Sequence, residues 1–190
     1  MIAYHNNRLG DQTLLPVPSL GALEQEFRDR TKKENREFEF ITDGIVYVVT
    51  SMGDYFGVNN GFEEIEKFMR LRRCLEAWVY HTHPHLNEDG TEEMHQILPP
   101  SFPDFRSSAL LNDDCLTNPR IKTRVIEKYG VWEYSMRRLP RCSQSDQYFY
   151  NYPIAMKIKE IKDLPIEEQV SEMLKFYKED DSKTVSFRRI

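Results

Sequence analysis

The chain has 190 residues, of which 39% are hydrophobic and 12% aromatic, which is enough for one domain with a substantial core. Its net charge of -5 argues against a nucleic-acid-binding protein, because such proteins usually present a basic surface. No run approaches the ~20 apolar residues of a membrane helix, and residues 1–12 lack the pattern of a signal peptide. We therefore expect a soluble, cytoplasmic protein with neither nucleic-acid nor membrane partners. Export by a route that needs no cleavable signal stays open.

The first half of the chain predicts an arm followed by alternating helices and strands. Residues 1–18 are polar and contain Pro16 and Pro18, so we expect an irregular arm there. Thr42-Asp43-Gly44 is a turn signal between two runs of strand-forming residues and predicts a β-hairpin. Apolar spacing and turn signals together predict a helix over 19–33, the hairpin over 37–51, a short strand at 55–58, a helix over 60–72 and a strand over 75–81.

The second half continues the alternation after a long acidic loop that contains several prolines. The elements expected there are the loop over 84–103, a helix over 104–111, paired strands over 122–128 and 131–137, a strand over 154–161 and an amphipathic helix after Pro165. We expect the last ten residues to fray. Helices interleaved with strands predict an α/β (α+β) fold, with a mixed sheet flanked by helices.

The motif His81-Thr82-His83-Pro84 ends the predicted strand over 75–81. Residues i and i+2 of a strand project from the same face, so His81 and His83 can point at one centre. Pro84 cannot donate to a strand ladder and ends the strand, which places both imidazoles where a cleft can open. An H-x-H by itself more often marks structural histidines at a strand end than a metal site.

A catalytic zinc ion commonly has three protein ligands and one position for water, so a third ligand is needed. It should be a histidine or a carboxylate, and the nearby candidates are Asp104, Asp89, His85 and His95. Asp104 belongs to a second short motif, SFPD, which begins at Ser101 directly after two prolines. The combination of HTHP and SFPD favours a metal site more strongly than either motif alone.

The pair H-x-H-P and S-x-x-D, with a glutamate on an earlier strand, resembles the motif of the JAMM/MPN (JAB-like) zinc metalloproteases. The segment REFEF...DGIVYVV followed by YHTHP is similar to the bacterial, toxin- or defence-associated branch, and the resemblance covers about residues 35–140. It implies a JAB/MPN-like (cytidine-deaminase-like) architecture. We expect a domain over 19–140, and a C-terminal strand and helix extension over 141–190 packed on the same domain.

The resemblance implies that His81, His83 and Asp104 bind zinc (Zn2+). A zinc ion held in this way would lower the pKa of its bound water towards ~7 and polarise the scissile carbonyl. Ser101 would donate a hydrogen bond to the developing oxyanion. The sixteen residues over 85–100 make this spacing longer than is usual in the family, so they must loop out. This insert is either a lid or substrate clamp, or a passive surface loop.

The reaction also needs a carboxylate that accepts the proton of the attacking water and passes it to the leaving amine. The resemblance implies that it comes from the strand after the first helix, which carries Glu37 and Glu39. Both glutamates share a strand face, so their spacing does not separate them. We prefer Glu37, because Arg36-Glu37-Phe38 resembles the start of that strand in the bacterial relatives.

The function implied is a zinc-dependent peptidase or isopeptidase that hydrolyses an amide bond in a protein or peptide substrate, including a ubiquitin-like one. An immunity or regulatory protein is a further expected partner. The alternative is a metal-free, MPN-like scaffold or interaction module. A metal-dependent hydrolase of small molecules is less favoured, because such enzymes usually need further ligands and no histidine follows residue 104.

Overall fold

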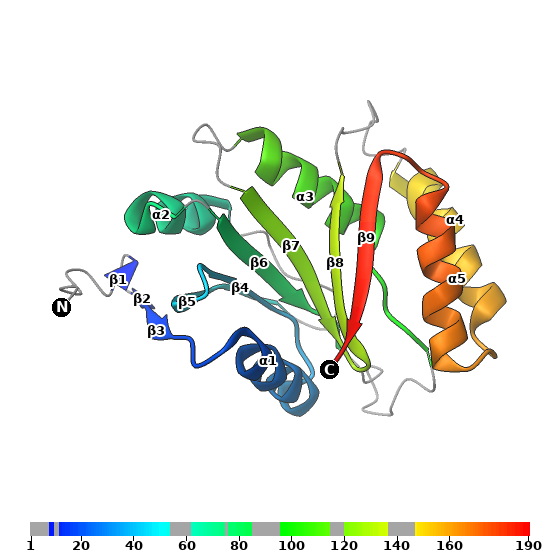
Figure 1. Ribbon diagram of the computed structural model, residues 1–190, viewed down its shortest axis with the longest axis horizontal. Helices are drawn as coiled ribbons and strands as arrows, with labels where there is room; N and C mark the ends of the chain where they lie inside the picture. The colour runs from blue at the N-terminus through cyan, green and yellow to red at the C-terminus, as the bar shows by residue number, and fades with distance from the viewer. Residues whose placement is uncertain are drawn as a thin grey trace.

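The computed structural model describes residues 8–9, 12–53, 62–74, 76–84, 96–114, 120–136 and 147–190. Helices and strands alternate around one mixed sheet in this part of the chain (Figure 1). The helices are α1 (Leu20–Glu34), α2 (Phe62–Arg72), α3 (Phe102–Asp114), α4 (Gln147–Ile161) and α5 (Ile166–Lys178). The strands are β1 (Arg8–Leu9), β2 (Gln12–Thr13), β3 (Leu15–Pro16), β4 (Phe38–Thr42), β5 (Val46–Met52), β6 (Glu76–Thr82), β7 (Arg120–Glu127), β8 (Gly130–Met136) and β9 (Lys183–Arg189).

The main sheet contains seven strands in the order β3-β5-β4-β6-β7-β8-β9. β6 and β7 run parallel, and the other neighbouring strands of this sheet pair antiparallel. The connection between β6 and β7 contains α3, as a parallel crossover requires. β6 is therefore a central strand, and its carboxyl end lies where ligands commonly bind in open α/β sheets.

Helices cover both faces of the sheet. On one face, α1 packs Leu23 and Phe27 against Phe38, Phe40 and Tyr80 of the central strands. On the other face, α2 and α3 cover the sheet, and α4 and α5 join α3 in a second core. Figure 1 shows α1 below the sheet, α2 and α3 above it, and α5 beside β9. Large side chains on both faces bury the central strands β4 and β6 almost completely, whereas the edge strands β3 and β9 are partly exposed.

Most of the expected elements are confirmed. The helices predicted over 19–33, 60–72 and 104–111 correspond to α1, α2 and α3, and the helix after Pro165 is α5. The predicted hairpin is β4 and β5, the strand that ends in the HTHP motif is β6, and the predicted strand pair is β7 and β8. The mixed sheet flanked by helices is therefore observed. The strand expected at 55–58 lies outside the described residues.

The strand expected over 154–161 is wrong, because this segment belongs to α4. The alternation of Ile154, Met156 and Ile158 is compatible with a strand. Ile154, Ile158 and Ile161, however, also follow helical spacing, and these three pack in the core while Met156 is exposed. α4 even contains Pro153 in its interior. Burial against α3 and α5 outweighed the local strand pattern.

The expected fraying of the last ten residues is also wrong, because β9 pairs with β8 along its whole length. Val185 and Phe187 alternate with the exposed Thr184 and Ser186, and they pack against the core. Gly130 permits this pairing, because a Cβ at that position would collide with the β9 backbone and the Phe187 ring. β9 therefore covers the edge that β8 would otherwise expose.

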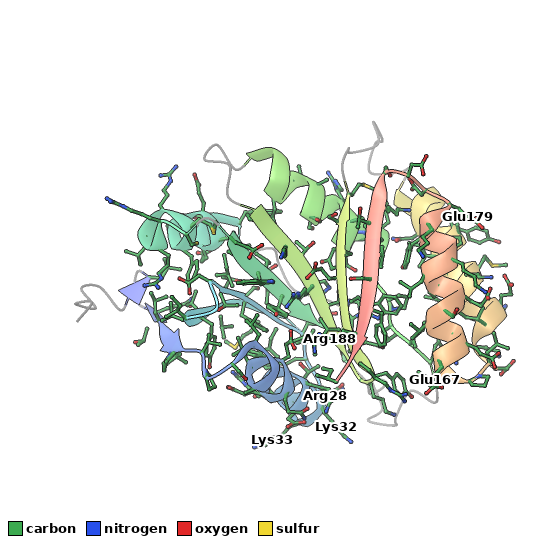
Figure 2. The ribbon with its side chains drawn as sticks, viewed as in Figure 1. Arg28, Lys32, Lys33, Glu167, Glu179 and Arg188 are labelled. Carbon is green, nitrogen blue, oxygen red and sulfur yellow. The ribbon has the colours of Figure 1, made fainter. Side chains whose placement is uncertain are left out.

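A buried charge cluster fastens β9 to the α1 side of the sheet. The carboxylate of Glu24 is fully buried and accepts hydrogen bonds from Tyr80 Oη at 2.8 Å, Arg124 Nη1 at 3.3 Å and Arg188 Nη2 at 2.5 Å. Figure 2 shows Arg188 of β9 close to Arg28 of α1, whose side chain contacts the C-terminal carbonyl at 3.5 Å. The C-terminal strand is thus held by side chains as well as by its ladder.

The described part of the expected N-terminal arm contains short strands. β1 pairs with β2, and β3 pairs with β5 at the edge of the main sheet. Leu9 and Leu14 are buried in the core beneath α2. Among the described residues, no helix is both long enough and apolar enough to cross a membrane.

Candidate metal centre

The two histidines of the HTHP motif lie at the carboxyl end of β6. His81 is in the strand, and His83 follows it, held to β7 by a hydrogen bond from its backbone N–H to the Ile126 carbonyl at 3.0 Å. The Nε2 atoms of the two imidazoles are 3.1 Å apart. The i, i+2 spacing therefore brings both rings to one point, on the face of the sheet that α3 covers.

Asp104 reaches the same point from the first turn of α3. Its Oδ1 lies 3.1 Å from His81 Nε2, and its Oδ2 lies 3.9 Å from His83 Nε2. One ligand atom from each of the three residues lies within 4.8 Å of the others. Of the four candidates for a third ligand, Asp104 is the one inside the described part of the chain, since His85, Asp89 and His95 fall outside it.

The SFPD motif has a structural role that explains its spacing. Ser101 precedes α3, and Asp104 Oδ2 accepts hydrogen bonds from the Ser101 backbone N–H at 2.6 Å and from Oγ at 2.7 Å. The first of these bonds is one half of a capping box, in which the side chain at the third helical position reaches back to the backbone N–H of the cap residue. The motif thus starts the helix and also fixes the carboxylate beside both histidines.

Each ligand candidate is oriented by a partner on its far side. His83 Nδ1 lies 3.1 Å from the Leu98 carbonyl, and because a carbonyl only accepts, His83 carries a proton on Nδ1. His81 Nδ1 lies 3.4 Å from Tyr134 Oη. Burial and the nearby Asp104 raise the pKa of Tyr134, so its hydroxyl keeps its proton. Partners of this kind hold metal-binding histidines with Nε2 facing the ion.

The site is buried and electrostatically suited to a cation. Burial lowers the pKa of His81, but the carboxylates of Asp104, Glu37 and Glu39 outweigh burial and raise it to about 9. Burial and the positive charge of His81 lower the pKa of His83 to about 4. Burial opposes ionisation of Asp104, yet His81 brings the pKa of Asp104 well below its usual range. The paired charges of His81 and Asp104 therefore stabilise each other, and the carboxylates of Glu37 and Glu39 add negative potential to the site.

Zinc fits this donor set. Two ligands bound at ~2.0–2.1 Å to a tetrahedral ion lie roughly 3.3 Å apart. His81 Nε2 lies 3.1 Å from both His83 Nε2 and Asp104 Oδ1, close to that value, whereas His83 Nε2 lies 3.9 Å from the other carboxylate oxygen, Oδ2. Two imidazole nitrogens and one carboxylate oxygen are also a common set for catalytic zinc.

The two candidate bases lie beside the same point. Glu39 in β4 is directly opposite His81 in β6, so both side chains share one face of the sheet. Glu37 immediately precedes β4, and its backbone carbonyl accepts a hydrogen bond from Gly53 at 3.0 Å. Both carboxylates are buried, and both raise the pKa of His81, Glu37 by the larger amount. Glu39 Oε1 is engaged by Thr50 Oγ1 at 2.8 Å.

Three residues that contact this site could not be predicted from any sequence motif. Tyr134 sits in the middle of β8, Leu98 lies in the long loop, and Glu127 ends β7 with its Oε2 2.8 Å from the Leu98 backbone N–H. Each acts on a ligand only through tertiary contact. No spacing or motif connects any of them with HTHP.

No protein-family model, curated protein or solved structure matches the chain. The residues of the candidate metal centre, His81, His83 and Asp104, are therefore the basis on which its function is inferred.

Proposed function

We propose that the chain is a zinc-dependent peptidase or isopeptidase of the JAMM/MPN type. The observation that carries the proposal is the convergence of His81, His83 and Asp104 from β6 and α3, next to two buried glutamates. The order of helix, hairpin, helix, ligand-bearing strand and ligand-bearing helix supports a JAB/MPN-like architecture. A zinc ion bound there would lower the pKa of its water and polarise the scissile carbonyl.

The other catalytic tasks fall to protein side chains. Glu37 accepts the proton of the attacking water and delivers it to the leaving amine, which an amide needs in order to depart. We assign this task to Glu37 because Arg36-Glu37-Phe38 resembles the start of the corresponding strand in the bacterial members of the family. The Ser101 hydroxyl donates to Asp104 in the structure, so it would have to turn from Asp104 to donate to an oxyanion.

We propose a protein or peptide as the substrate, with a ubiquitin-like protein as one candidate and an immunity or regulatory protein as a further partner. The insert over 85–100 joins the two ligand-bearing motifs, and its last residues contact His83 through the Leu98 carbonyl. The described end of the insert, residues 96–100, thus lies beside a candidate ligand, where a substrate would bind.

A metal-free scaffold remains the second candidate, and one observation favours it. His81 and Asp104 form a buried ion pair at 3.1 Å, and the backbone N–H and hydroxyl of Ser101 donate hydrogen bonds to the remaining oxygen of the carboxylate. Such a set of contacts stabilises the end of β6 and the start of α3 without any ion. The two candidates therefore differ in whether the chain binds zinc.

Elemental mass spectrometry of the purified chain, beside His83→Ala and Asp104→Ala, tests the proposal. We expect about one zinc per chain in the wild type, and its loss in both variants. The zinc-loaded wild type is then incubated with a degenerate peptide mixture, and new termini are identified by mass spectrometry with Glu37→Gln as the control. A folded wild type that neither contains nor takes up zinc would support the scaffold instead.

A further inference from the structure

The segment over 97–101 lacks regular secondary structure but is fixed in place by side chains from distant elements. We call it the ligand strap, because it connects the Leu98 carbonyl, which contacts His83, with the SFPD motif. Ile97, Pro99 and Pro100 are buried. A buried segment without helix or strand partners must satisfy its backbone polar groups in some other way.

Side-chain oxygens accept every backbone N–H from residue 97 to residue 102. Pro99 and Pro100 have no backbone N–H. The N–H groups of the other four residues donate hydrogen bonds to side-chain oxygens from β7, α3, α4 and α5. The pairs are Ile97 with Gln169 Oε1 at 3.3 Å, Leu98 with Glu127 Oε2 at 2.8 Å, Ser101 with Asp104 Oδ2 at 2.6 Å and Phe102 with Asn151 Oδ1 at 2.9 Å. The C-terminal helices thus take part in holding the strap.

Two carbonyls of the strap accept hydrogen bonds from side chains as well. The Leu98 carbonyl accepts from His83 Nδ1 at 3.1 Å, and the Pro100 carbonyl accepts from Tyr177 Oη at 2.5 Å. The contact with Leu98 keeps the His83 proton on Nδ1 and leaves Nε2 free of it, which is the tautomer that a metal requires. The orientation of His83 therefore depends on where the strap lies.

Glu127 is the anchor closest to this contact. It is fully buried at the end of β7, and it binds the N–H of the same residue, Leu98, whose carbonyl meets His83. The Trp132 side chain is a further partner of this carboxyl group. A buried carboxyl group is costly, and an apolar side chain would fill the same space more cheaply. The hydrogen bond from the Leu98 N–H explains why a carboxyl group, and not an apolar side chain, occupies this position.

We propose that Glu127 and Tyr177 are positioning residues of the metal centre: they hold the ligand strap so that the Leu98 carbonyl fixes the tautomer and orientation of His83. The importance of this arrangement for zinc rests on the function proposed above. It makes α5 part of the metal centre, although no residue of that helix touches a candidate ligand in the described contacts. Both residues act on zinc through Leu98 and His83.

The first test measures the His83 tautomer in the metal-free chain, by NMR of protein with ¹⁵N-labelled histidine. Glu127→Leu removes the acceptor for the Leu98 N–H, whereas Glu127→Gln keeps an acceptor oxygen. We expect the wild type and Glu127→Gln to show one form protonated on Nδ1, and Glu127→Leu to show a mixture of tautomers. A folded Glu127→Leu with the wild-type tautomer would overturn the proposal, and this readout needs no zinc.

The second test measures zinc affinity by competition with a chelator. We expect the dissociation constant to rise about 10- to 100-fold in Glu127→Leu, as for other residues that support a ligand, with a smaller rise in Tyr177→Phe. Tyr47→Phe is the matched control, because its hydroxyl contacts Glu26 at 3.4 Å, away from the strap. If Glu127→Leu does not fold, the His83 tautomer and the zinc affinity of Tyr177→Phe test the proposal instead.

These outcomes separate the two proposals. A wild type that binds no zinc contradicts the proposed function, while the tautomer comparison still decides whether the strap positions His83. Unchanged tautomer and zinc affinity in folded Glu127→Leu and Tyr177→Phe would instead overturn the positioning role and leave the zinc site standing.

Discussion

The hydroxyl of Thr82 accepts a hydrogen bond from the backbone N–H of Phe38 at 3.0 Å. Thr82 lies between the two candidate ligands in the sequence, yet it is on the opposite face of the sheet, where Thr31 of α1 also donates to it at 2.7 Å. The contact fixes the start of β4, and therefore the residue before it, Glu37, relative to the histidines. One side chain thus links the candidate base to the ligand-bearing strand.

Thr82→Val should separate folding stability from zinc binding. Valine leaves the buried N–H of Phe38 and the hydroxyl of Thr31 without their acceptor, so the free energy of unfolding should fall by ~1–3 kcal/mol. Zinc content should stay close to wild type, because neither histidine loses a contact. Urea denaturation and elemental analysis measure the two effects, and Thr82→Ser should restore stability. Wild-type stability in Thr82→Val would show that the hydrogen bond contributes little.

Glu37→Gln and Glu39→Gln should differ in catalysis. Loss of the general base in Glu37→Gln should reduce peptide cleavage by about 10²- to 10⁴-fold with zinc retained, because glutamine cannot accept the proton. Glu39→Gln should keep most of the activity, since an amide can still accept the hydrogen bond from Thr50. Turnover of a peptide found in the degenerate mixture is the measurement. Full activity in Glu37→Gln and loss in Glu39→Gln would transfer the role to Glu39.

Zinc should stabilise the wild type but not Asp104→Asn. At a free zinc concentration of 100 times the dissociation constant, binding should add about 2.7 kcal/mol to the free energy of unfolding, and a chelator should remove it. Asparagine keeps an acceptor for the Ser101 N–H, so the cap of α3 should survive the change. Denaturation with zinc and with chelator checks this. Equal stabilisation of Asp104→Asn would indicate a third ligand elsewhere, with Asp89 and His95 as the next candidates.

Glu127 should make the metal-free chain less stable above neutral pH. Burial raises the pKa of Glu127 from 4.5 to about 7 in the folded chain. The folded state therefore binds the proton more tightly, and this contribution is complete below about pH 4.5 and is lost as the pH rises through 7. At 1.36 kcal/mol per pKa unit the loss is about 3 kcal/mol.

The measurement is the free energy of unfolding from pH 4.5 to pH 8 in the presence of a chelator. Glu127→Gln should lack this loss, so its stability relative to the wild type should improve as the pH rises. Titration of the histidines is common to both chains and cancels in the difference. Parallel pH profiles of the two proteins would mean that Glu127 does not hold its proton in the folded state.

The sequence by itself was sufficient for elements whose pattern is local. Three local features depend on residues within a few positions of one another. They are the apolar spacing of α1, α2 and α5, the turn at Thr42-Asp43-Gly44, and the end of β6 shortly before Pro84. The candidate site also came from local motifs, HTHP and SFPD. Alternation directs His81 and His83 to one face, and the side chain three positions after Ser101 reaches back to the Ser101 N–H at the start of α3.

Only the tertiary structure decided which distant groups meet. The segment over 154–161 satisfies both strand and helix spacing, and packing against α3 and α5 selected the helix. β9 is ordered because β8 offers an unpaired edge and Glu24 binds Arg188. Glu127 and Tyr177 act on the metal centre through backbone groups of the strap. Such contacts cannot be predicted from the sequence, because the backbone N–H and carbonyl do not depend on residue type. Contacts across many residues depend on how whole elements pack, and no local pattern specifies them.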